Sequence, residues 1–512
     1  MTKVKFYSNK KKIMKRLIFC TLAFCSVLIF SCEKKKVEEP ENDEENKTFN
    51  VPEDYFSIQS AINASVDGST IFVQPGIYQE NINFIGKKVI VCSTDPNDTG
   101  VVGTTIIDGN TQGTVVTFDN GETNSSVLNG FTIINGDAGT SNGGGVLIKN
   151  NSSPVIKNSV FISNTAKYGA GICVSGQSQP KIEGNIFNAN VANGSRGTAI
   201  YVMDESSVII DSNIFKNHLN VDGVIHIGST YTDESSAVIS NNTINNNTTE
   251  FGTGAIKVTA ASTAEISNNT ITNNTGSGDY SACGITISKK SQANISNNTI
   301  TDNAAKQNGA ILIYDESEAV ITGNTISGNS AGSASDTRYG TGGAISVTYS
   351  SIADISNNTI SENYAWNLNH GGGGIIISYS STATIDNNQI FDNNAYRFGG
   401  GVYVRFNSNY VTITNNVISG NNADGYGASD GGGVYLRNIV KAVVHNNDIK
   451  NNWAQRFCGG IYVYNNVDVL ECESEELWIR NNYPPVENFY NVYNNNTHGD
   501  NTNEGADVYF SD

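Results

Sequence analysis

Two nearly identical stretches, I-S-N-N-T-I-T-N-N at residues 266–274 and I-S-N-N-T-I-T-D-N at residues 295–303, decide the fold of this 512-residue chain. Their pattern is an aliphatic residue followed by Phe or Ile five positions later and, in most units, by Asn at the third and eighth positions. It begins at Ile156, Ile182, Ile210, Ile239, Ile266, Ile295, Ile321, Ile355, Ile385, Ile413 and Val444. Ser159 replaces the first Asn once, His218 replaces the second Asn once, and successive units start 26 to 34 residues apart.

A repeat of this length predicts a solenoid. Alternating apolar positions and a Gly-rich segment before most units indicate three short strands per unit, and one such unit cannot bury its apolar face without stacked neighbours. Asn suits tight turns, and in-register amides can form ladders from coil to coil. Leu is too scarce for a leucine-rich repeat, and the unit is shorter than the roughly 40 residues of a propeller blade. The sequence therefore predicts an all-β, single-stranded parallel β-helix of roughly 14 coils.

The N-terminal region is predicted to be a targeting segment and a tether. Residues 1–31 contain seven Lys or Arg, no acid and the apolar run 17–30, as in a secretory signal. Residues 32–51 are charged and read as a flexible tether, so the β-helix is expected to span 52–512. Within its N-terminal cap, residues 52–70, the segment 57–66 predicts a short amphipathic helix.

Ile29-Phe30-Ser31-Cys32 resembles a bacterial lipobox. The resemblance implies that Cys32 is lipidated and anchors the protein to the outer membrane, facing either the surface or the periplasm; ordinary secretion is the alternative. The net charge of −18 argues against nucleic-acid binding, and we expect a monomer. No CxxC spacing suggests a zinc site, and Cys458 and Cys472 are close enough in sequence for one disulfide.

Beyond the repeat itself, three motifs carry a family resemblance. Residues 56–91 resemble the opening segment of right-handed parallel β-helices of the pectin-lyase-like superfamily, and the repeats (PbH1-type units) are similar to theirs. Gly342–Ile345 (GGAI) and Phe161–Asn164 (FISN) also resemble motifs of polymorphic outer-membrane proteins. The superfamily resemblance implies a right-handed helix and enzymes acting on acidic polysaccharides. The motifs of pectate lyases, polygalacturonases and pectin esterases are absent, so no catalytic residue is transferred.

Acidic pairs recur six and five residues before the repeat start, at Asp204-Glu205, Asp233-Glu234 and Asp315-Glu316. The first two pairs lie on adjacent coils, where stacked carboxylates need either solvation or a hard cation such as Ca²⁺. A calcium site at Asp204, Glu205, Asp233 and Glu234 and a solvated turn are the alternatives. Lys289-Lys290 occupies the same positions one coil before Asp315.

Basic and aromatic residues gather in the variable turn after the second Asn. The expected glycan-binding stripe comprises Tyr168, Arg338, Tyr339, Trp366, Tyr396, Arg397, Trp453 and Arg456. Aromatic rings stack on sugars and guanidinium groups bind carboxylate or sulfate. Three functions remain open: non-catalytic binding of an acidic polysaccharide, a polysaccharide lyase with Lys306, Arg338 or Arg397 as the base, and a spacer or adhesin with protein partners.

Overall fold

The computed structural model describes residues 47–219, 222–229, 234–249, 252–278, 282–333, 340–368, 371–406, 408–425, 429–438, 442–456 and 459–464, and three short strands between residues 492 and 511. Cys32, Asp233, Arg338, Tyr339, Cys458 and Cys472 lie outside these residues. Among the described residues, no helix is long and apolar enough to cross a membrane.

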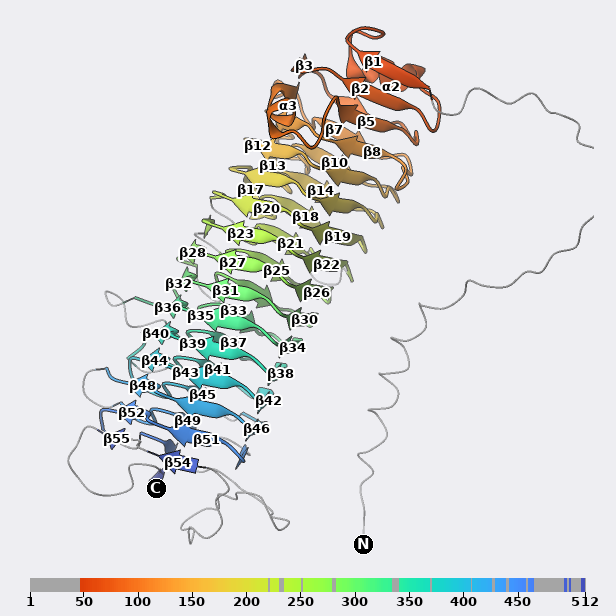
Figure 1. The fold of residues 1–512 in the computed structure, drawn as a ribbon. Helices are drawn as coiled ribbons and strands as arrows, with labels where there is room; N and C mark the ends of the chain where they lie inside the picture. Colours follow the sequence, from red (N-terminus) through yellow and green to blue (C-terminus); the bar gives the residue numbers. More distant parts are fainter. Residues whose placement is uncertain are drawn as a thin grey trace, which may run out of the picture. The chain divides into compact units, whose positions relative to one another are not determined.

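One coil shows how the repeat folds (Figure 1). Strand β37 (Ile345–Val347) is followed by β38 (Ile352–Ser356), β39 (Thr359–Ser361) and the two-residue strand β40 (Tyr364–Ala365) before β41 (Ile375–Ile377) starts the next coil. Each strand pairs in parallel with its counterparts in the coils on either side. The predicted parallel β-helix is confirmed, and this coil has a fourth short strand that the sequence pattern did not reveal.

Stacking of the coils produces three sheets of 15 strands each. Sheet A runs from β1 (Thr48–Val51) to β50 (Ala442–His445), and sheet B runs from β3 (Gly76–Gln79) to β54 (Val492–Asn494). The fourth strands form a nine-stranded sheet E from β24 (Thr248–Thr249) to β55 (Thr497–His498), and β13 (Thr165–Tyr168) pairs with β17 (Val191–Arg196) nearer the N-terminus.

Sheet C is formed by the strands that follow the Gly-rich segments. Its strands are β4 (Ile82–Asn83), β7 (Val116–Phe118), β10 (Val146–Ile148), β14 (Ile172–Val174), β18 (Ile200–Val202), β21 (Ile225–Ile227), β25 (Ile256–Val258), β29 (Ile285–Ile287), β33 (Ile311–Ile313), β37, β41, β45 (Val402–Val404), β49 (Val434–Arg437), β53 (Ile461–Tyr464) and β56 (Val508–Ser511).

The core consists of aliphatic columns in the register that the sequence predicts. Ile300, Ile326 and Ile360 are adjacent in sheet B and fully buried, while Thr325 is exposed. Phe161, Phe187 and Phe215 stack with ring centroids 4.7 and 4.9 Å apart. A one-residue shift would turn these side chains to solvent, so burial fixes the register.

The two asparagine positions form buried ladders. Asn324 illustrates the contacts: its Nδ2 donates to Ile295 O at 2.8 Å and to Asn358 Oδ1 at 3.0 Å, while its Oδ1 accepts from Asn298 N at 2.9 Å. The residue before each ladder Asn takes the left-handed conformation, as at Asn297 (φ 55°) and Asn357 (φ 58°). In the repeated Asn-Asn pair, the first residue thus adopts the turn conformation and the second forms the hydrogen bonds that join the coils.

A short helix covers the N-terminal end, as predicted. Helix α2 (Ile58–Ala64) buries Ile58, Ala61 and Ile62, and Glu80 accepts hydrogen bonds from two of its N-terminal amides at 2.7 and 3.0 Å. Strand β1 pairs with β2 (Thr70–Val73), so the solenoid begins four residues before the expected boundary at 52. A second helix, α3 (Thr99–Thr104), was not expected; Asp98 caps it by accepting from Gly100 N at 2.7 Å.

Candidate functional site

The two acidic pairs that the structure describes in full, Asp204-Glu205 and Asp315-Glu316, lie in exposed turns between sheets C and A. Both residues of the pair Asp204-Glu205 have left-handed φ values of 57° and 56°, and Glu205 accepts a hydrogen bond from Gln177 at 2.9 Å. Glu234 is exposed at the equivalent turn. No group of three or more His, Cys, Asp or Glu in the described part of the chain is placed to hold a metal ion. The calcium site, which depends on Asp233, stays a prediction.

Along the solenoid the same turn changes character. Lys290 forms an ion pair with Glu316 at 3.5 Å, which confirms that the lysine and acidic turns are adjacent, and both side chains are more than half exposed. On the following coils the turn carries Tyr349 and then Tyr379, whose rings stack at 4.9 Å, and Phe406 continues the stack at 4.9 Å. A row that is acidic near the N-terminus thus becomes aromatic toward the C-terminus.

The predicted stripe is divided into separate groups. Tyr168 lies beside Arg196, whose guanidinium is 5.4 Å from the tyrosine ring. Trp366 and Tyr396, which the structure brings together, have ring centroids 6.0 Å apart. Trp453 pairs with Asn422 in sheet E, in the column that contains Tyr364 and Asn394. Trp366 and Tyr396 lie two residues further along their coils, so Trp453 does not align with their rings.

The described cations of the stripe already have intramolecular contacts. Arg456 binds Asp430 through two hydrogen bonds of 3.0 and 2.6 Å, and these raise the pKa of the arginine. Arg397 donates to Leu368 O and lies 4.9 Å from the ring of Phe398. Lys306, which the sequence suggests as a candidate base, is half-buried and directly precedes Gln307.

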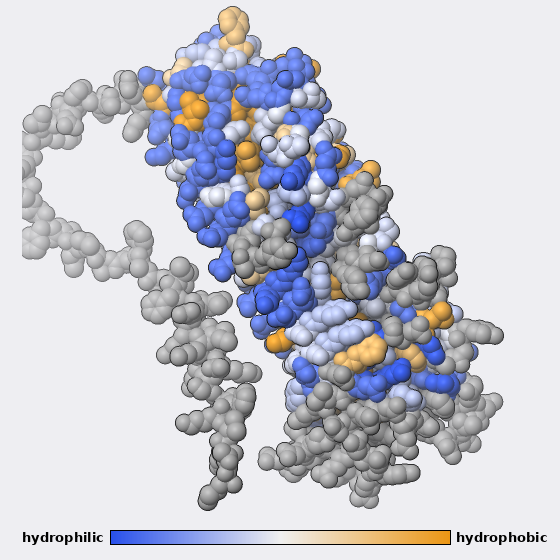
Figure 2. All heavy atoms as spheres, turned by 180° about the vertical axis from the view of Figure 1, so that it is seen from behind, coloured by the Kyte–Doolittle hydropathy of each residue, from blue (hydrophilic) through white to orange (hydrophobic). Residues whose placement is uncertain are grey.

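A second feature lies on the outer face of sheet C. The first and third residues of its strands enter the core, so the middle residue must point outward. Most of these middle residues are nevertheless nearly fully buried: Cys173, Tyr201, His226, Thr286, Leu312, Ser346, Ile376, Tyr403, Tyr435 and Tyr462. Thr117, Leu147 and Lys257 are half-buried. The outer face of sheet C is therefore covered. On the face seen in Figure 2, hydrophilic side chains predominate and apolar ones form small patches.

Toward the C-terminal half this face contains a cavity of about 140 Å³, here called the sheet C groove. Strand residues Leu312, Ser346 and Ile376 line it between the loops that precede sheet C and the turns that follow it. Its lining also includes Gln307, Asn308, Tyr314, Thr341, Thr348, Tyr349, Asn367, Ser378, Tyr379 and Arg405. Tyr349 and Tyr379 also line an open depression of about 570 Å³ that reaches Asp315, Glu316, Phe406 and Asn438.

Aromatic ladders border the groove. Besides the Tyr349–Tyr379–Phe406 stack, Tyr403 and Tyr435 stack at 5.0 Å with their planes 5° apart. Rings stacked in this way cover each other's faces, so the exposed parts are ring edges and hydroxyl groups. Tyr349 and Tyr379 remain 41% and 39% exposed.

Arg405 is the most unusual residue of the groove. It is 2% exposed, with its guanidinium 4.2 Å from the ring of Phe406, 5.5 Å from that of Tyr403 and 5.7 Å from that of Tyr379. Burial lowers its pKa. Its Nε and Nη1 groups have no hydrogen-bond partner among the described residues, and neither does the buried Ser346 hydroxyl.

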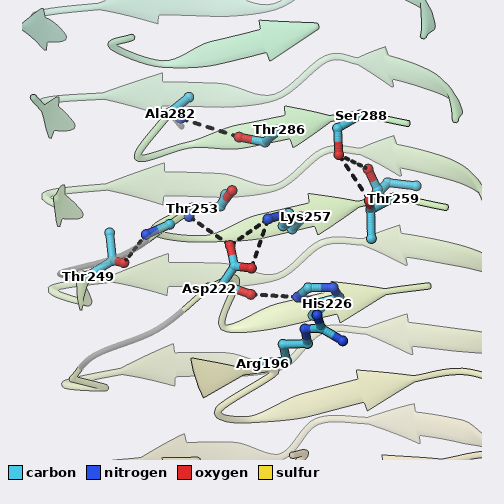
Figure 3. Close-up of polar contacts among 12 residues, drawn as sticks. Arg196, Asp222, His226, Thr249, Thr253, Lys257, Thr259, Ala282, Thr286 and Ser288 are labelled. Carbon is cyan, nitrogen blue, oxygen red and sulfur yellow. Dashed lines mark hydrogen bonds and ion pairs between the residues drawn. The ribbon is translucent and has the colours of Figure 1, made fainter. Parts of the chain in front are cut away.

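A polar cluster occupies the same face nearer the N-terminus (Figure 3). Lys257 Nζ lies 2.7 and 2.8 Å from the two carboxylate oxygens of Asp222, and His226 Nδ1 lies 2.6 Å from the Asp222 carbonyl oxygen. Burial raises the pKa of Asp222, but Lys257 outweighs it and the net shift is downward. Burial lowers the pKa of His226 to about 4, so the ring is neutral at pH 7.

The sequence does contain a signal for this face. Val402–Arg405 (VYVR), Val434–Arg437 (VYLR) and Ile461–Tyr464 (IYVY) repeat a bulky polar residue at each outward position. Solvent-facing positions of a repeat normally vary freely, so recurring Tyr and Arg there mark a covered surface. The sequence pattern identified these segments only as strands after Gly-rich stretches, and the groove was not predicted.

The comparisons with known proteins agree with this fold. The family model described as "Right handed beta helix region" matches residues 192–340 and 343–512, more than half of the chain. The chain belongs to this right-handed β-helix family. The match also confirms the hand expected from the resemblance.

Other comparisons add little about the β-helix protein. No curated protein matches the sequence significantly. A solved structure described as the receptor-binding protein of bacteriophage Det7, a podoviral tailspike in a myovirus, is similar at 12% identity, with 78% of this chain and 73% of that chain covered and a TM-score of 0.22. A TM-score this low carries no argument about function.

Proposed function

We propose that this β-helix protein binds a polysaccharide chain lengthwise along the outer face of sheet C. The observation that carries the proposal is the sheet C groove, where aromatic edges, hydroxyls and amides surround a cavity that crosses several coils. Its volume is below the roughly 300–1,000 Å³ typical of sites that enclose a small ligand. It therefore suits part of an extended chain, with the adjoining depression receiving neighbouring units.

The spacing of the groove supports this ligand class. Equivalent groups repeat at the coil spacing, as the 4.9 Å separation of Tyr349 and Tyr379 illustrates. This is close to the advance of one sugar residue in an extended polysaccharide, so each coil can present the same groups to successive sugars. Ser378 and Thr348, whose hydroxyls bond at 3.0 Å, also line the groove and provide polar contacts for sugar hydroxyls.

The groove is a better candidate than the predicted stripe. Arg456 is held by Asp430 and Arg397 by Leu368 O, so a ligand would compete with contacts that already exist. Trp366 packs against Tyr364 at 4.1 Å as well as against Tyr396, which covers much of its surface. We therefore assign a structural role to these stripe residues.

Location at the cell envelope is part of the proposal. The lipobox-like sequence at Cys32 supports a lipid anchor on the outer membrane, and residues 33–46 would link the anchor to the first strand at Thr48. A solenoid tethered in this way can meet extracellular or periplasmic polysaccharide.

Binding to alginate, polygalacturonate, dextran sulfate and dextran tests the proposal. Tyr379→Ala should weaken binding about fivefold, because a ring contact contributes about 1 kcal/mol. Tyr410→Ala is the matched control: Tyr410 begins β46 (Tyr410–Thr414) of sheet A and is 40% exposed, compared with 39% for Tyr379. Equal effects of the two changes would contradict the assignment of the groove. The same incubations test the lyase alternative, because elimination leaves an unsaturated uronate that absorbs ultraviolet light.

A further inference from the structure

Two arginines of the sheet C face have no counter-charge among the residues that the structure describes. Arg405 directly follows β45 and Arg437 ends β49, so the two arginines occupy equivalent positions in neighbouring coils. Within the described ranges neither forms an ion pair with a carboxylate, and each repels the other's charge rather than compensating it. In a chain of net charge −18, a buried cation without a paired anion is unexpected.

The immediate surroundings hold these cations without neutralising them. The rings of Phe406, Tyr403 and Tyr379 surround the Arg405 guanidinium at 4.2, 5.5 and 5.7 Å. Burial raises the pKa of Tyr403, and the nearby charges of Arg405 and Arg437 oppose that shift. Aromatic rings offset part of the desolvation of a cation. They cannot satisfy the N–H groups, and Nε and Nη1 of Arg405 remain without acceptors among the described residues.

The acidic turn at Asp315 and Glu316 does not line the cavity that Arg405 lines. Asp315 and Glu316 line the outer depression together with Tyr349 and Tyr379, and Glu316 is paired with Lys290 at 3.5 Å. The cavity that Arg405 lines contains no carboxylate among its described lining residues. Its polar lining also includes the Ser346 hydroxyl, which is buried and without a partner in the described structure.

We infer that Arg405, supported by Arg437, forms an anion subsite that receives a carboxylate or sulfate group of the bound polysaccharide. This inference rests on the proposed function and specifies its ligand as an acidic glycan. Nε and Nη1 lie on different edges of the guanidinium, so the anion takes one of them and a sugar hydroxyl takes the other. A charged hydrogen bond made by a buried guanidinium is stronger than one at the surface, which makes the subsite selective for charge.

The test compares acidic and neutral ligands on the folded full-length protein. We expect dextran sulfate or polygalacturonate to bind about 10- to 100-fold more tightly than dextran or carboxyl-reduced polygalacturonate, the range expected for one charged hydrogen bond. Arg405→Met keeps the side-chain length and removes the charge, and should abolish this difference. Lys181→Met, at the start of β15 (Lys181–Glu183) in sheet A, makes the same change in net charge on another face.

A second measurement is independent of polymer binding. Sodium sulfate and sodium glucuronate, compared with sodium chloride at equal ionic strength, should raise the melting temperature of the wild type more than that of Arg405→Met. Arg405→Met should itself melt at or above the wild-type temperature without these anions, because it removes an uncompensated buried charge.

The outcomes separate the inference from the proposed function. If acidic and neutral glycans bind equally and Arg405→Met changes neither, the anion subsite is wrong while polysaccharide binding stands. If no glycan binds, the proposed function fails, and the melting experiment still decides whether Arg405 takes an anion. Equal stabilisation of wild type and Arg405→Met by the free anions would overturn the subsite.

Discussion

Replacing Asn324 tests how the coils are held together. Its side chain is 1% exposed and bonds three successive coils: Nδ2 donates to Ile295 O at 2.8 Å and to Asn358 Oδ1 at 3.0 Å, and Oδ1 accepts from Asn298 N at 2.9 Å. Asn324→Ala removes all of these contacts. The Asn298 amide hydrogen then loses its acceptor inside the solenoid.

The structure allows a magnitude to be estimated. A buried polar group left unpaired costs about 1–3 kcal/mol, and the small cavity adds to this, so Asn324→Ala should destabilise by about 2–4 kcal/mol. Asn324→Ser should cost only about half as much, because a hydroxyl can replace the lost acceptor. Ser159 shows this at the same ladder position, where its Oγ accepts from Phe131 N at 3.2 Å.

Denaturant midpoints of the wild type and both variants would measure the costs, and amide hydrogen exchange at Asn298 would locate the effect. Solenoids are stabilised by nearest-neighbour contacts, so the loss of protection should spread to adjacent coils before distant ones. The reasoning is refuted if the free energy of unfolding of Asn324→Ala lies within about 0.5 kcal/mol of the wild-type value, because that difference is below the cost of one unpaired buried group. It is also refuted if serine is as damaging as alanine.

Further predictions concern the core, a buried histidine, the anchor and calcium. Ile326→Asp should prevent folding or strongly lower the melting temperature, because it places a charge in the core. Thr325→Asp, at an exposed position, should change the melting temperature little. Equal effects of the two changes would mean that the assigned register is wrong by one residue. Burial lowers the pKa of His218 to about 4, so as the pH falls the unfolded state binds a proton before the folded state does. The free energy of unfolding should therefore fall as the pH drops from about 6.5 toward 4. His218→Asn should reduce this loss in acid denaturation curves. Cys32→Ser should release the protein from membranes, and retention after carbonate washing would disprove the lipid anchor. Millimolar calcium should raise the melting temperature and Asp204→Asn should remove that rise; a wild type indifferent to calcium favours a solvated turn.

The fold was predictable because the repeat pattern shows which residues of successive coils stack on one another. Each Ile five positions after the repeat start stacks on its counterpart, as Ile300, Ile326 and Ile360 do. In a solenoid, contacts in space are contacts between equivalent sequence positions, so alignment of the units amounts to a contact map. The Asn ladders followed from the same alignment.

Features outside the repeat were less predictable. Helix α3 consists of Thr, Gly and Val residues with low helix propensity, and its cap at Asp98 is a local contact with little sequence signal. The fourth strand has only two residues, such as Tyr364–Ala365, and alternation cannot be recognised over such a length.

The candidate site was missed because outward-facing residues were assumed to be exposed. Alternation places Tyr403 and Arg405 on the outer face of sheet C correctly, but it cannot show that loops from other parts of the coil cover that face. The predicted stripe had the opposite problem: Arg456 has the right chemistry for a ligand, yet Asp430, 26 residues away, already occupies it.

Charge compensation therefore discriminates between candidate residues better than residue type. Arg456 and Arg405 are both arginines beside aromatic rings, and both could be proposed for glycan binding from the sequence. Arg456 forms two hydrogen bonds with a carboxylate, and their strength resists exchange for a ligand. Arg405 is desolvated by the fold and has no anionic partner among the described residues, so binding an anion regains an interaction without repeating the full cost of burial. An acidic glycan should therefore bind where the fold has left a cation uncompensated, and not where cations are most numerous.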